Sequence, residues 1–275
     1  MGDFDFKVID VEDEIQHMID EIKKYFVKNG NVNTKAVIGI SGGKDSTIAA
    51  ALLVRALGSE RVVGVMMPEG TQKDIHDSQE VCDILDIEAY TINIGDAVQA
   101  LYGGLIPVRA QSEIDGPLPA IVTTNTPARI RMATLYAVAG LVGGRVINTG
   151  NKSELYIGYT TKYGDLAGDF AIFKDYCVRE ILEIGDNLDE LPSYLVHKAP
   201  GDGMSGKTDE DNTGISYDVL DAYLLDEVMP DYDTLHKIED RHIRNLHKRD
   251  IHIPYIRIKT RAWHENSDKE PDIWA

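Results

Sequence analysis

Apolar residues along the chain recur first at helical spacing and then in short runs separated by periodic segments. Over residues 11–28 they lie three and four positions apart, which predicts a helix with one buried face. Four β-branched runs then predict strands at 36–40, 61–67, 89–94 and 145–149. The periodic segments between them predict helices at 45–57, 73–85, 95–102 and 127–141. Strands that alternate with helices indicate a parallel sheet with crossover helices, so we expect an open, doubly wound α/β fold with flanking helices.

The pattern changes in the last third of the chain. The stretch "APGDGMSGKTDEDNTG" (199–214) is rich in glycine and polar residues and shows no periodicity. A loop of this length inside a compact domain is often a lid over a binding site, and a plain surface loop is the alternative. Helices are predicted again near 216–228 and 232–247. We expect one domain over residues 1–275, with a nucleotide-binding core at about 30–185, a lid at 199–214 and a C-terminal helical segment at 216–275.

The composition narrows the class of protein and its partners. Lys and Arg number 28 against 46 Asp and Glu, and the net charge of -18 argues against a nucleic-acid partner, which needs a basic face. The two cysteines, Cys82 and Cys177, are far apart, which fits a reducing cytosol and excludes a cysteine zinc site. The sequence shows no membrane-spanning apolar stretch and no secretory signal pattern. We therefore expect a cytoplasmic protein without membrane or nucleic-acid partners.

The stretch "AVIGISGGKDSTIAAALL" (36–53) places a glycine-rich turn between a predicted strand and a predicted helix. Two adjacent glycines let the backbone turn sharply, and the helix N-terminus attracts a phosphate through its unpaired N–H groups. The spacing differs from that of the common P-loop, and Asp45 follows Lys44 where that loop has a hydroxyl. A carboxylate there would repel a phosphate unless a cation lies between them, and Mg²⁺ is the natural candidate. The alternative is an ordinary glycine-rich turn.

Polar segments follow three of the predicted strands. They are "SGGKDS" after the first strand, "PEGTQKD" after the second and "TGNKSE" after the fourth. In such sheets, ligands bind outside the carboxyl ends of the strands, where the strand order reverses. Because the three segments must lie at one edge of a parallel sheet, we expect the ligand site there.

The "SGGKDS" string resembles the pyrophosphate-binding loop of the N-type ATP pyrophosphatases, which split ATP into AMP and pyrophosphate. Together with "NTPARIRMATLY", "TGNKSELYIGYTTKYGD", "GKTDEDNTGISYD" and "HKR", it makes residues 36–249 similar to the ammonia-dependent NAD synthetases. The resemblance implies a doubly wound homodimer of the adenine nucleotide α-hydrolase type. It also implies that deamido-NAD, ATP and ammonia give NAD, AMP and pyrophosphate through an acyl-adenylate.

The same resemblance assigns the site residues. ATP would be bound by the glycine loop and by two further side chains, which gives Gly39, Ile40, Ser41, Gly42, Gly43, Lys44, Asp45, Ser46, Gln72 and Thr149. Mg²⁺ would be held by Asp45 and Glu154. Deamido-NAD would be bound, partly across the dimer, by Arg129, Lys162, Asp169, His247 and Lys248. The catalytic assignments are Lys44, a cation for the ATP phosphates, and Asp165, which would accept a proton from the attacking ammonia.

The chain departs from the family pattern at two positions of the ATP site. Val178 stands where the family usually has a lysine, and Gly201 where it has a serine or threonine. Candidates to replace their contacts are Lys174, Arg179, Ser205 and Lys207. No nucleophilic-cysteine glutaminase module fits within the 275 residues, so the resemblance implies free ammonia as the nitrogen source.

Two rival functions remain open. A tRNA-modifying ATP pyrophosphatase would need a basic surface and often paired cysteines, and this sequence supplies neither. A nucleotide-binding protein without catalysis would fit the departures at Val178 and Gly201, although the candidate site acids are retained. At the level of single residues, Arg129 also fits a solvated helix face beside Arg131. A release of AMP that depends on deamido-NAD would separate these functions.

Overall fold

The computed structural model describes residues 10–71, 75–112, 115–198, 208–249, 255–256 and 259. Its centre is one parallel sheet with the strand order β3-β2-β1-β4-β5. The strands are β1 (Lys35–Gly39), β2 (Val62–Met66), β3 (Glu88–Thr91), β4 (Gly144–Asn148) and β5 (Phe170–Ala171). The chain adds strands on one side of β1 and then crosses over to add β4 and β5 on the other side. The expected doubly wound α/β fold is confirmed, and its switch point lies between β1 and β4.

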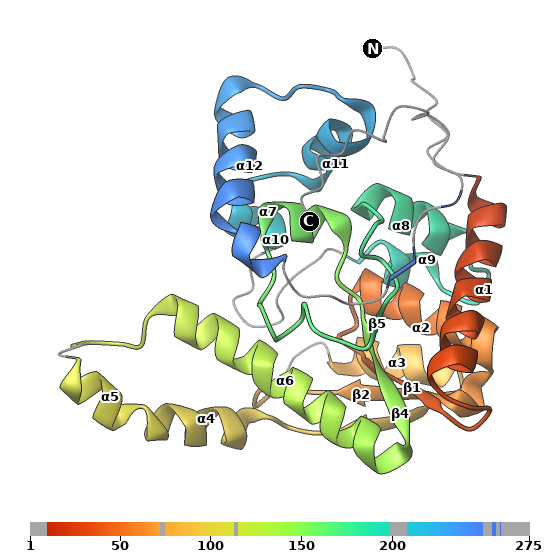
Figure 1. Cartoon of the computed structure of the whole chain (residues 1–275), viewed down its shortest axis with the longest axis horizontal. Helices are drawn as coiled ribbons and strands as arrows, with labels where there is room; N and C mark the ends of the chain where they lie inside the picture. The colour runs from red at the N-terminus through yellow and green to blue at the C-terminus, as the bar shows by residue number, and fades with distance from the viewer. Residues whose placement is uncertain are drawn as a thin grey trace.

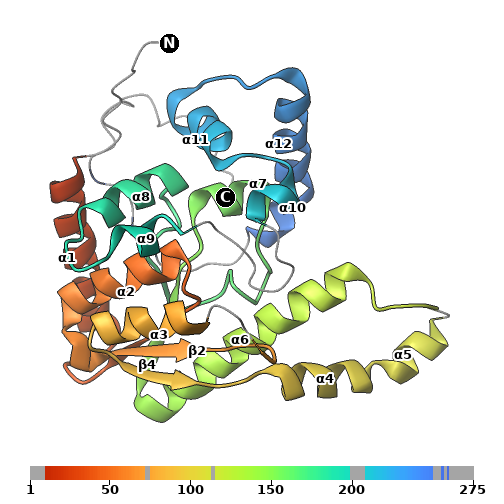
Figure 2. The ribbon, with the colours of Figure 1, turned by 180° about the vertical axis from the view of Figure 1, so that it is seen from behind.

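Helices cover both faces of this sheet (Figures 1 and 2). They are α1 (Val11–Asn29), α2 (Lys44–Leu57), η1 (Ser59–Arg61), α3 (Ile75–Ile84), α4 (Gly95–Gly104), α5 (Ile106–Gln111), α6 (Ala120–Val142), α7 (Lys152–Ile157), α8 (Val178–Asp186), α9 (Ser193–Val196), α10 (Asp209–Thr213), α11 (Tyr217–Asp226), α12 (Tyr232–Arg244) and η2 (Leu246–Lys248). Ala36 and Ile38 of β1 join the apolar cluster of α1, α2, α3, α8 and α9, whereas Val37 joins the cluster of α6. This alternation along β1 places α6 on the face opposite α2.

The central unit β1–loop–α2 forms as its apolar pattern predicts. Strand β1 is buried over its three middle residues, which suits a strand covered on both faces. Helix α2 buries Ile48, Leu52 and Leu53 completely, and it ends at Gly58, whose φ of +87° favours glycine. Both elements lie within one residue of their predicted bounds.

The other predicted elements agree with the structure to within about three residues, apart from the start of α6. Strand β3 ends at Thr91, although Ile92 and Ile94 still donate their backbone N–H groups to Met66 O and Pro68 O at 2.9 Å each. The periodicity did not predict β5, η1, α5, α7, α9 or α10, which span two to six residues, because segments this short carry too few positions to show a hydrophobic period. It also did not predict α8, although this nine-residue helix buries Val178, Ile181 and Ile184 at helical spacing. Within the described part of the chain, none of the helices is sufficiently long and apolar to cross a membrane.

The predicted start of the helix at Pro127 is wrong, because α6 begins at Ala120 and carries Pro127 inside it. A proline inside a helix lacks the N–H group that would bond the carbonyl four residues earlier. Here that carbonyl belongs to Thr123, and it accepts a hydrogen bond from the Tyr102 hydroxyl of α4 at 3.3 Å instead. A tertiary contact therefore stabilises the turns of α6 that come before the predicted start of the helix.

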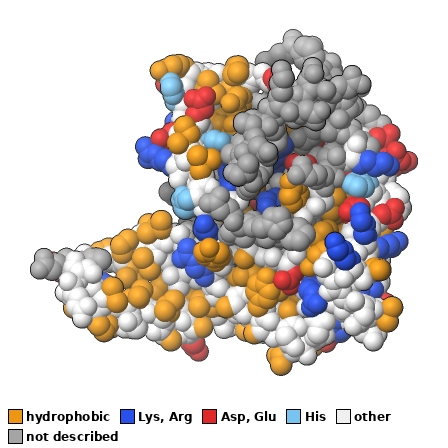
Figure 3. All heavy atoms as spheres, in the orientation of Figure 1, with side chains coloured by type: hydrophobic (Ala, Val, Ile, Leu, Met, Phe, Trp, Pro, Cys, Tyr) orange, Lys and Arg blue, Asp and Glu red, His pale blue; other side chains and the backbone are white. Residues whose placement is uncertain are grey.

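Helices α4, α5 and the first turns of α6 project from the body of the protein and form an arm (Figure 1). Several of its apolar side chains are exposed, namely Leu101, Ile106, Val108 and Ile121. Apolar side chains cover much of this projection in the space-filling view (Figure 3). A contiguous exposed apolar surface of this kind is typical of a binding interface.

Candidate active site

The glycine loop connects β1 to α2 at the carboxyl edge of the sheet. Gly42 has a φ of +74°, and an added Cβ would lie 3.1 Å from Ser78 Oγ and 3.2 Å from Asp77 Cβ. Ser41 Oγ accepts a hydrogen bond from Gly43 N at 3.2 Å, and Ser46 Oγ donates to Gly43 O at 3.0 Å. These contacts fix the loop so that the N-terminus of α2 opens at the sheet edge, where a phosphate would be stabilised.

Lys44 and Asp45 form a largely buried ion pair in the first turn of α2. Lys44 Nζ lies 2.9 Å from Asp45 Oδ2, and the two side chains are 4% and 18% exposed. Burial alone would lower the pKa of Lys44, but the charges of Asp45, Glu154 and Asp209 outweigh burial and raise this pKa. Lys44 therefore stays protonated, as a cation for bound phosphates must be.

Glu154 lies in α7, directly after β4, and completes the predicted acidic pair. Its backbone N–H donates to Asn151 Oδ1 at 2.9 Å, and its Oε2 accepts from Asn151 N at 3.3 Å, which is a capping box. Burial and then the charge of Asp45 raise the pKa of Glu154 well above its usual range. The two carboxyl groups come from the ends of neighbouring strands β1 and β4, as the sequence predicts.

The sequence did not assign Asp209 and Tyr217 to the site, although both face the same charges. Asp209 and Tyr217 are 8% and 6% exposed, and Tyr217 Oη lies 3.5 Å from Asp209 Oδ2. Lys44 Nζ lies 5.7 Å from the centre of the Tyr217 ring, a cation–π distance. The capping pair Thr208 and Asp211 could have indicated α10 within the predicted lid, but a five-residue helix leaves no period to find.

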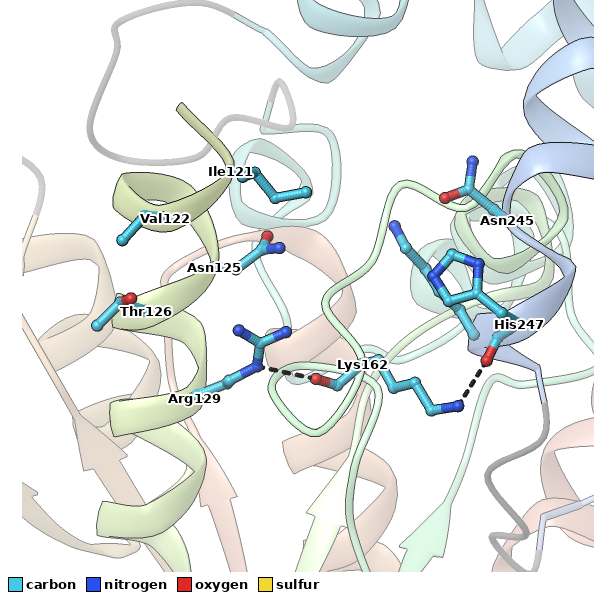
Figure 4. Close-up of a pocket in the computed structure, with 9 residues that line it drawn as sticks. Ile121, Val122, Asn125, Thr126, Arg129, Lys162, Asn245 and His247 are labelled. Carbon is cyan, nitrogen blue, oxygen red and sulfur yellow. Dashed lines mark hydrogen bonds between the residues drawn. The ribbon is translucent and has the colours of Figure 1, made fainter. Parts of the chain in front are cut away.

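A cavity of about 390 Å³ lies between the start of α6 and η2 (Figure 4). Its lining residues are Ile121, Val122, Asn125, Thr126, Arg129, Lys162, Asn245, His247 and Lys248. The structure thus brings together four of the five side chains predicted to bind the dinucleotide. Arg129 Nε donates to Lys162 O at 3.1 Å, and Lys162 Nζ donates to His247 O at 2.6 Å. Three cationic side chains in one cavity suit a negatively charged ligand.

The segment after α12 is fastened to the turn that follows α7. Lys248 Nζ donates to Gly158 O and Thr160 O at 2.7 Å each. Arg249 Nη2 donates to Tyr156 O at 2.6 Å, and its guanidinium lies 5.4 Å from the centre of the Tyr156 ring. In this structure the last two residues of "HKR" therefore hold one wall of the cavity against α7.

Asp165 and Asp169 lie outside the residues that line the cavity. Asp165 Oδ1 accepts from Thr161 N at 2.9 Å, and the side chain of Asp165 is accessible to solvent. Asp169 faces β4 and α6 instead, because its Oδ2 accepts from Val146 N at 2.8 Å and its Oδ1 from the Tyr136 hydroxyl at 3.2 Å. Thr149 directly follows β4 at the same sheet edge, and Gln72 lies outside the described residues.

The family departure at Val178 is a core position in this structure. Val178 is 6% exposed and packs in the apolar cluster of Ile157, Ile215, Tyr217, Leu220 and Ile238. The two described candidates for a replacement contact already have partners: Lys174 Nζ lies 5.0 Å from the centre of the Tyr255 ring, and Arg179 Nη2 donates to Asp226 Oδ2 at 2.8 Å. Gly201, Ser205 and Lys207 lie outside the described residues.

The acidic pair has the chemistry of a Mg²⁺ site. Asp45 Oδ1 is buried and has no hydrogen-bond partner in the structure. A buried carboxylate oxygen without a donor is costly unless a cation or another partner binds it. Hard oxygen donors in this position fit Mg²⁺, which binds through one or two carboxylates together with substrate phosphates. Among the described residues, no group of three or more His, Cys, Asp or Glu side chains is arranged to hold a metal ion.

Comparisons with known proteins agree with this arrangement. The family model for NAD synthase matches residues 14–252. The NH(3)-dependent NAD(+) synthetase of Methanococcoides burtonii is 41% identical over 192 residues, which are 69% of this chain and 70% of the relative. That of Methanosarcina mazei is 34% identical over 258 residues, 88% of this chain and 96% of the relative.

Solved structures give the same result. NMN synthetase from Francisella tularensis matches with a TM-score of 0.77 and 32% identity, over 90% of this chain and 98% of that one. NH3-dependent NAD synthetase from Campylobacter jejuni matches with a TM-score of 0.68 and 28% identity, over 89% of this chain and 98% of that one. The similarity to these two structures therefore extends over about nine-tenths of this chain.

Proposed function

The chain belongs to the NAD synthase family, and from this premise we propose that it amidates deamido-NAD with free ammonia, using ATP and releasing AMP and pyrophosphate. The family consists of ligases that form a carbon–nitrogen bond with ATP as cosubstrate, and it has the adenine nucleotide α-hydrolase fold. The observation that carries the finer proposal is the link between two sites. The phosphate loop with Lys44, Asp45 and Glu154 lies at the carboxyl ends of β1 and β4, and the segment after α7 leads from Glu154 to Lys162 of the cationic cavity.

The first proposed step activates the nicotinate carboxyl group, which is a poor electrophile. Attack of this carboxylate on the α-phosphate of ATP forms the acyl-adenylate and releases pyrophosphate. The N-terminus of α2 and Lys44 would stabilise the charge that develops on the departing pyrophosphate. Asp45 and Glu154 would hold Mg²⁺, which supplies further charge neutralisation on the same group when it is bound.

The second proposed step forms the amide bond. Ammonia attacks the acyl carbon, AMP leaves, and one proton must leave the attacking nitrogen. We assign Asp165 as the acceptor of that proton, as the family resemblance implies, because its carboxyl group is accessible to solvent and follows Lys162 of the cavity by three residues. Arg129, Lys162 and Lys248 would orient the dinucleotide through its negative charges, with Lys248 acting in part through the turn it holds.

The nitrogen source provides the direct test of this proposal. The purified protein is expected to form NAD from deamido-NAD, ATP and ammonium chloride, with one AMP released per NAD. The rate at fixed total ammonium should increase with pH as the NH₃ fraction increases. Glutamine at the same concentration should give no NAD. Chromatography of NAD and AMP measures both products, and efficient use of glutamine by the chain alone would refute the proposal.

The mononucleotide acid is a second candidate substrate, because the Francisella tularensis relative with a TM-score of 0.77 is named an NMN synthetase. NMN is the mononucleotide counterpart of NAD, so both proteins would amidate the same nicotinate group. The same assay with nicotinate mononucleotide in place of deamido-NAD decides between the two. We expect a higher kcat/KM with the dinucleotide, in line with the NAD(+) synthetases that match most of the chain.

We further propose that the protein is a homodimer through the exposed apolar arm. Ile121 supports this proposal because it belongs both to the arm and to the cavity lining, so a second copy packed there would complete the site. A charge placed in the arm by Ile106→Asp is expected to give a monomer in sedimentation velocity and to raise the KM for deamido-NAD more than that for ATP. Leu141→Asp, at the far end of α6, is the matched exposed control. A wild-type protein that sediments as a monomer would contradict the proposal.

A further inference from the structure

A second buried carboxylate lies behind Glu154. Asp221 of α11 is 1% exposed, and its Oδ1 accepts a hydrogen bond from Ser153 Oγ at 2.5 Å. Its Oδ2 accepts from the backbone N–H of Arg179 at 2.7 Å. Ser153 is fully buried and itself accepts from the N–H of Val178 at 3.2 Å. One carboxylate thus connects α7, the first turn of α8 and α11.

The Asp221 carboxylate lies at the N-terminus of α8, where a negative charge is favoured. The first turn of a helix leaves backbone N–H groups unpaired, and a carboxylate there is favoured by the helix dipole. Asp221 and Ser153 together satisfy two such groups of α8. A carboxylate buried to this extent costs much free energy unless it is hydrogen-bonded, so removing one partner leaves the other unsatisfied. The first turns of α7 and α8 are therefore fixed relative to the middle of α11.

Glu154 follows Ser153 in a helix of only six residues. The hydrogen bond from Ser153 to Asp221 therefore also helps to fix the position of Glu154. The capping box of α7 occupies one oxygen of the Glu154 carboxyl group, because Oε2 accepts from Asn151 N at 3.3 Å. The hydrogen bond from Ser153 to Asp221 holds α7 without that carboxyl group. The same α11 carries Tyr217, whose ring lies beside Lys44. Asp221 therefore connects α7, which carries Glu154, to α11, which carries Tyr217.

We propose that Asp221 is a positioning residue that acts through Ser153 to hold the Glu154 carboxyl group at the metal side of the phosphate loop. This inference rests on the proposed function, in which Asp45 and Glu154 bind the metal ion. Asp221 touches neither the nucleotide nor the ion in this scheme. Groups that orient metal ligands in this way typically contribute about 10- to 100-fold to metal affinity.

The test measures metal binding without turnover. Mn²⁺ binding to the full chain is followed by electron paramagnetic resonance in the presence of α,β-methylene-ATP, whose α–β linkage is not cleaved. Asp221→Asn and Ser153→Ala are each expected to weaken Mn²⁺ binding at least tenfold, with deamido-NAD binding by calorimetry changed less than twofold. The double variant should bind Mn²⁺ no more weakly than the single variant with the lower Mn²⁺ affinity, because both changes break one network.

Asp226→Asn is the matched control. Asp226 lies on the same helix and pairs with the Arg179 side chain rather than with Ser153. It should leave Mn²⁺ binding unchanged. If Ser153→Ala, the milder change, binds Mn²⁺ like the wild type, or if Asp226→Asn weakens binding equally, the positioning role is refuted.

Ser153→Ala alone decides the matter if Asp221→Asn does not fold. Wild-type protein that binds no Mn²⁺ with the analogue refutes both the metal assignment and the role of Asp221. Wild-type protein that binds Mn²⁺ but forms no NAD refutes only the proposed reaction.

Discussion

Asp45→Asn and Glu154→Gln are each expected to lower kcat for NAD formation by about 10²–10³, the usual effect of losing one group that stabilises developing charge. Each substitution removes a negative charge from the proposed metal site and changes the shape of the side chain little. Asp45 Oδ1 has no hydrogen-bond partner in the structure. An amide nitrogen in place of this oxygen therefore breaks no existing contact. Initial rates at saturating deamido-NAD and ATP, over a range of Mg²⁺ concentrations, measure the effect.

High Mg²⁺ should rescue neither variant fully, because the lost group also orients the bound ion. The exposed Asp83 of α3 supplies the control, and Asp83→Asn should keep the wild-type rate. Near-normal turnover of Glu154→Gln at low Mg²⁺ would show that Glu154 is not a metal ligand.

Lys44→Met is expected to reduce kcat by a similar factor of about 10²–10³, since it removes the buried cation of the phosphate loop. The unbranched methionine keeps most of the side-chain volume, so the loss reports the charge rather than the packing. Lys44→Arg keeps the charge, but its larger planar guanidinium must fit where the lysine side chain is only 4% exposed, and we expect intermediate activity. Rapid quench measurement of pyrophosphate release isolates the step in question.

Circular dichroism of the same preparations shows whether the fold is kept in both variants. A Lys44→Met protein within tenfold of the wild-type rate would mean that the N–H groups of α2 alone stabilise the pyrophosphate.

The sequence predicted those parts of the site whose elements have a clear hydrophobic period. Strand β1 and helix α2 are long and apolar, so the loop between them was located correctly, and β4 likewise located Glu154. Parallel strands then required both acids to lie at one sheet edge. The assignments of Arg129 and Lys162 to a common cavity came from the family resemblance, since periodicity gives no information about two distant segments meeting.

The features that the sequence missed depend on contacts between distant residues. Helix α10 is only five residues long and shows no hydrophobic period, so the sequence did not reveal that Asp209 contacts Tyr217 and that its charge acts on Lys44. The assignment of Asp169 to the dinucleotide site stays a prediction, and within this chain its hydrogen bonds lead to Val146 and Tyr136. The direction of one side chain at the end of a loop is set by such partners, which no local pattern encodes.

We expect the wall of the cavity that α6 forms to bend most readily at Pro127. The helix α6 lacks one backbone hydrogen bond at this residue, and Thr123 O is bonded from α4 instead. Ile121, Val122 and Asn125 line the cavity before the proline, and Arg129 lines it after the proline. A small change of helix angle at Pro127 would therefore alter the width of the cavity mouth while the sheet and the phosphate loop stay still. Such a change would admit a bulky ligand without any rearrangement at the acidic pair.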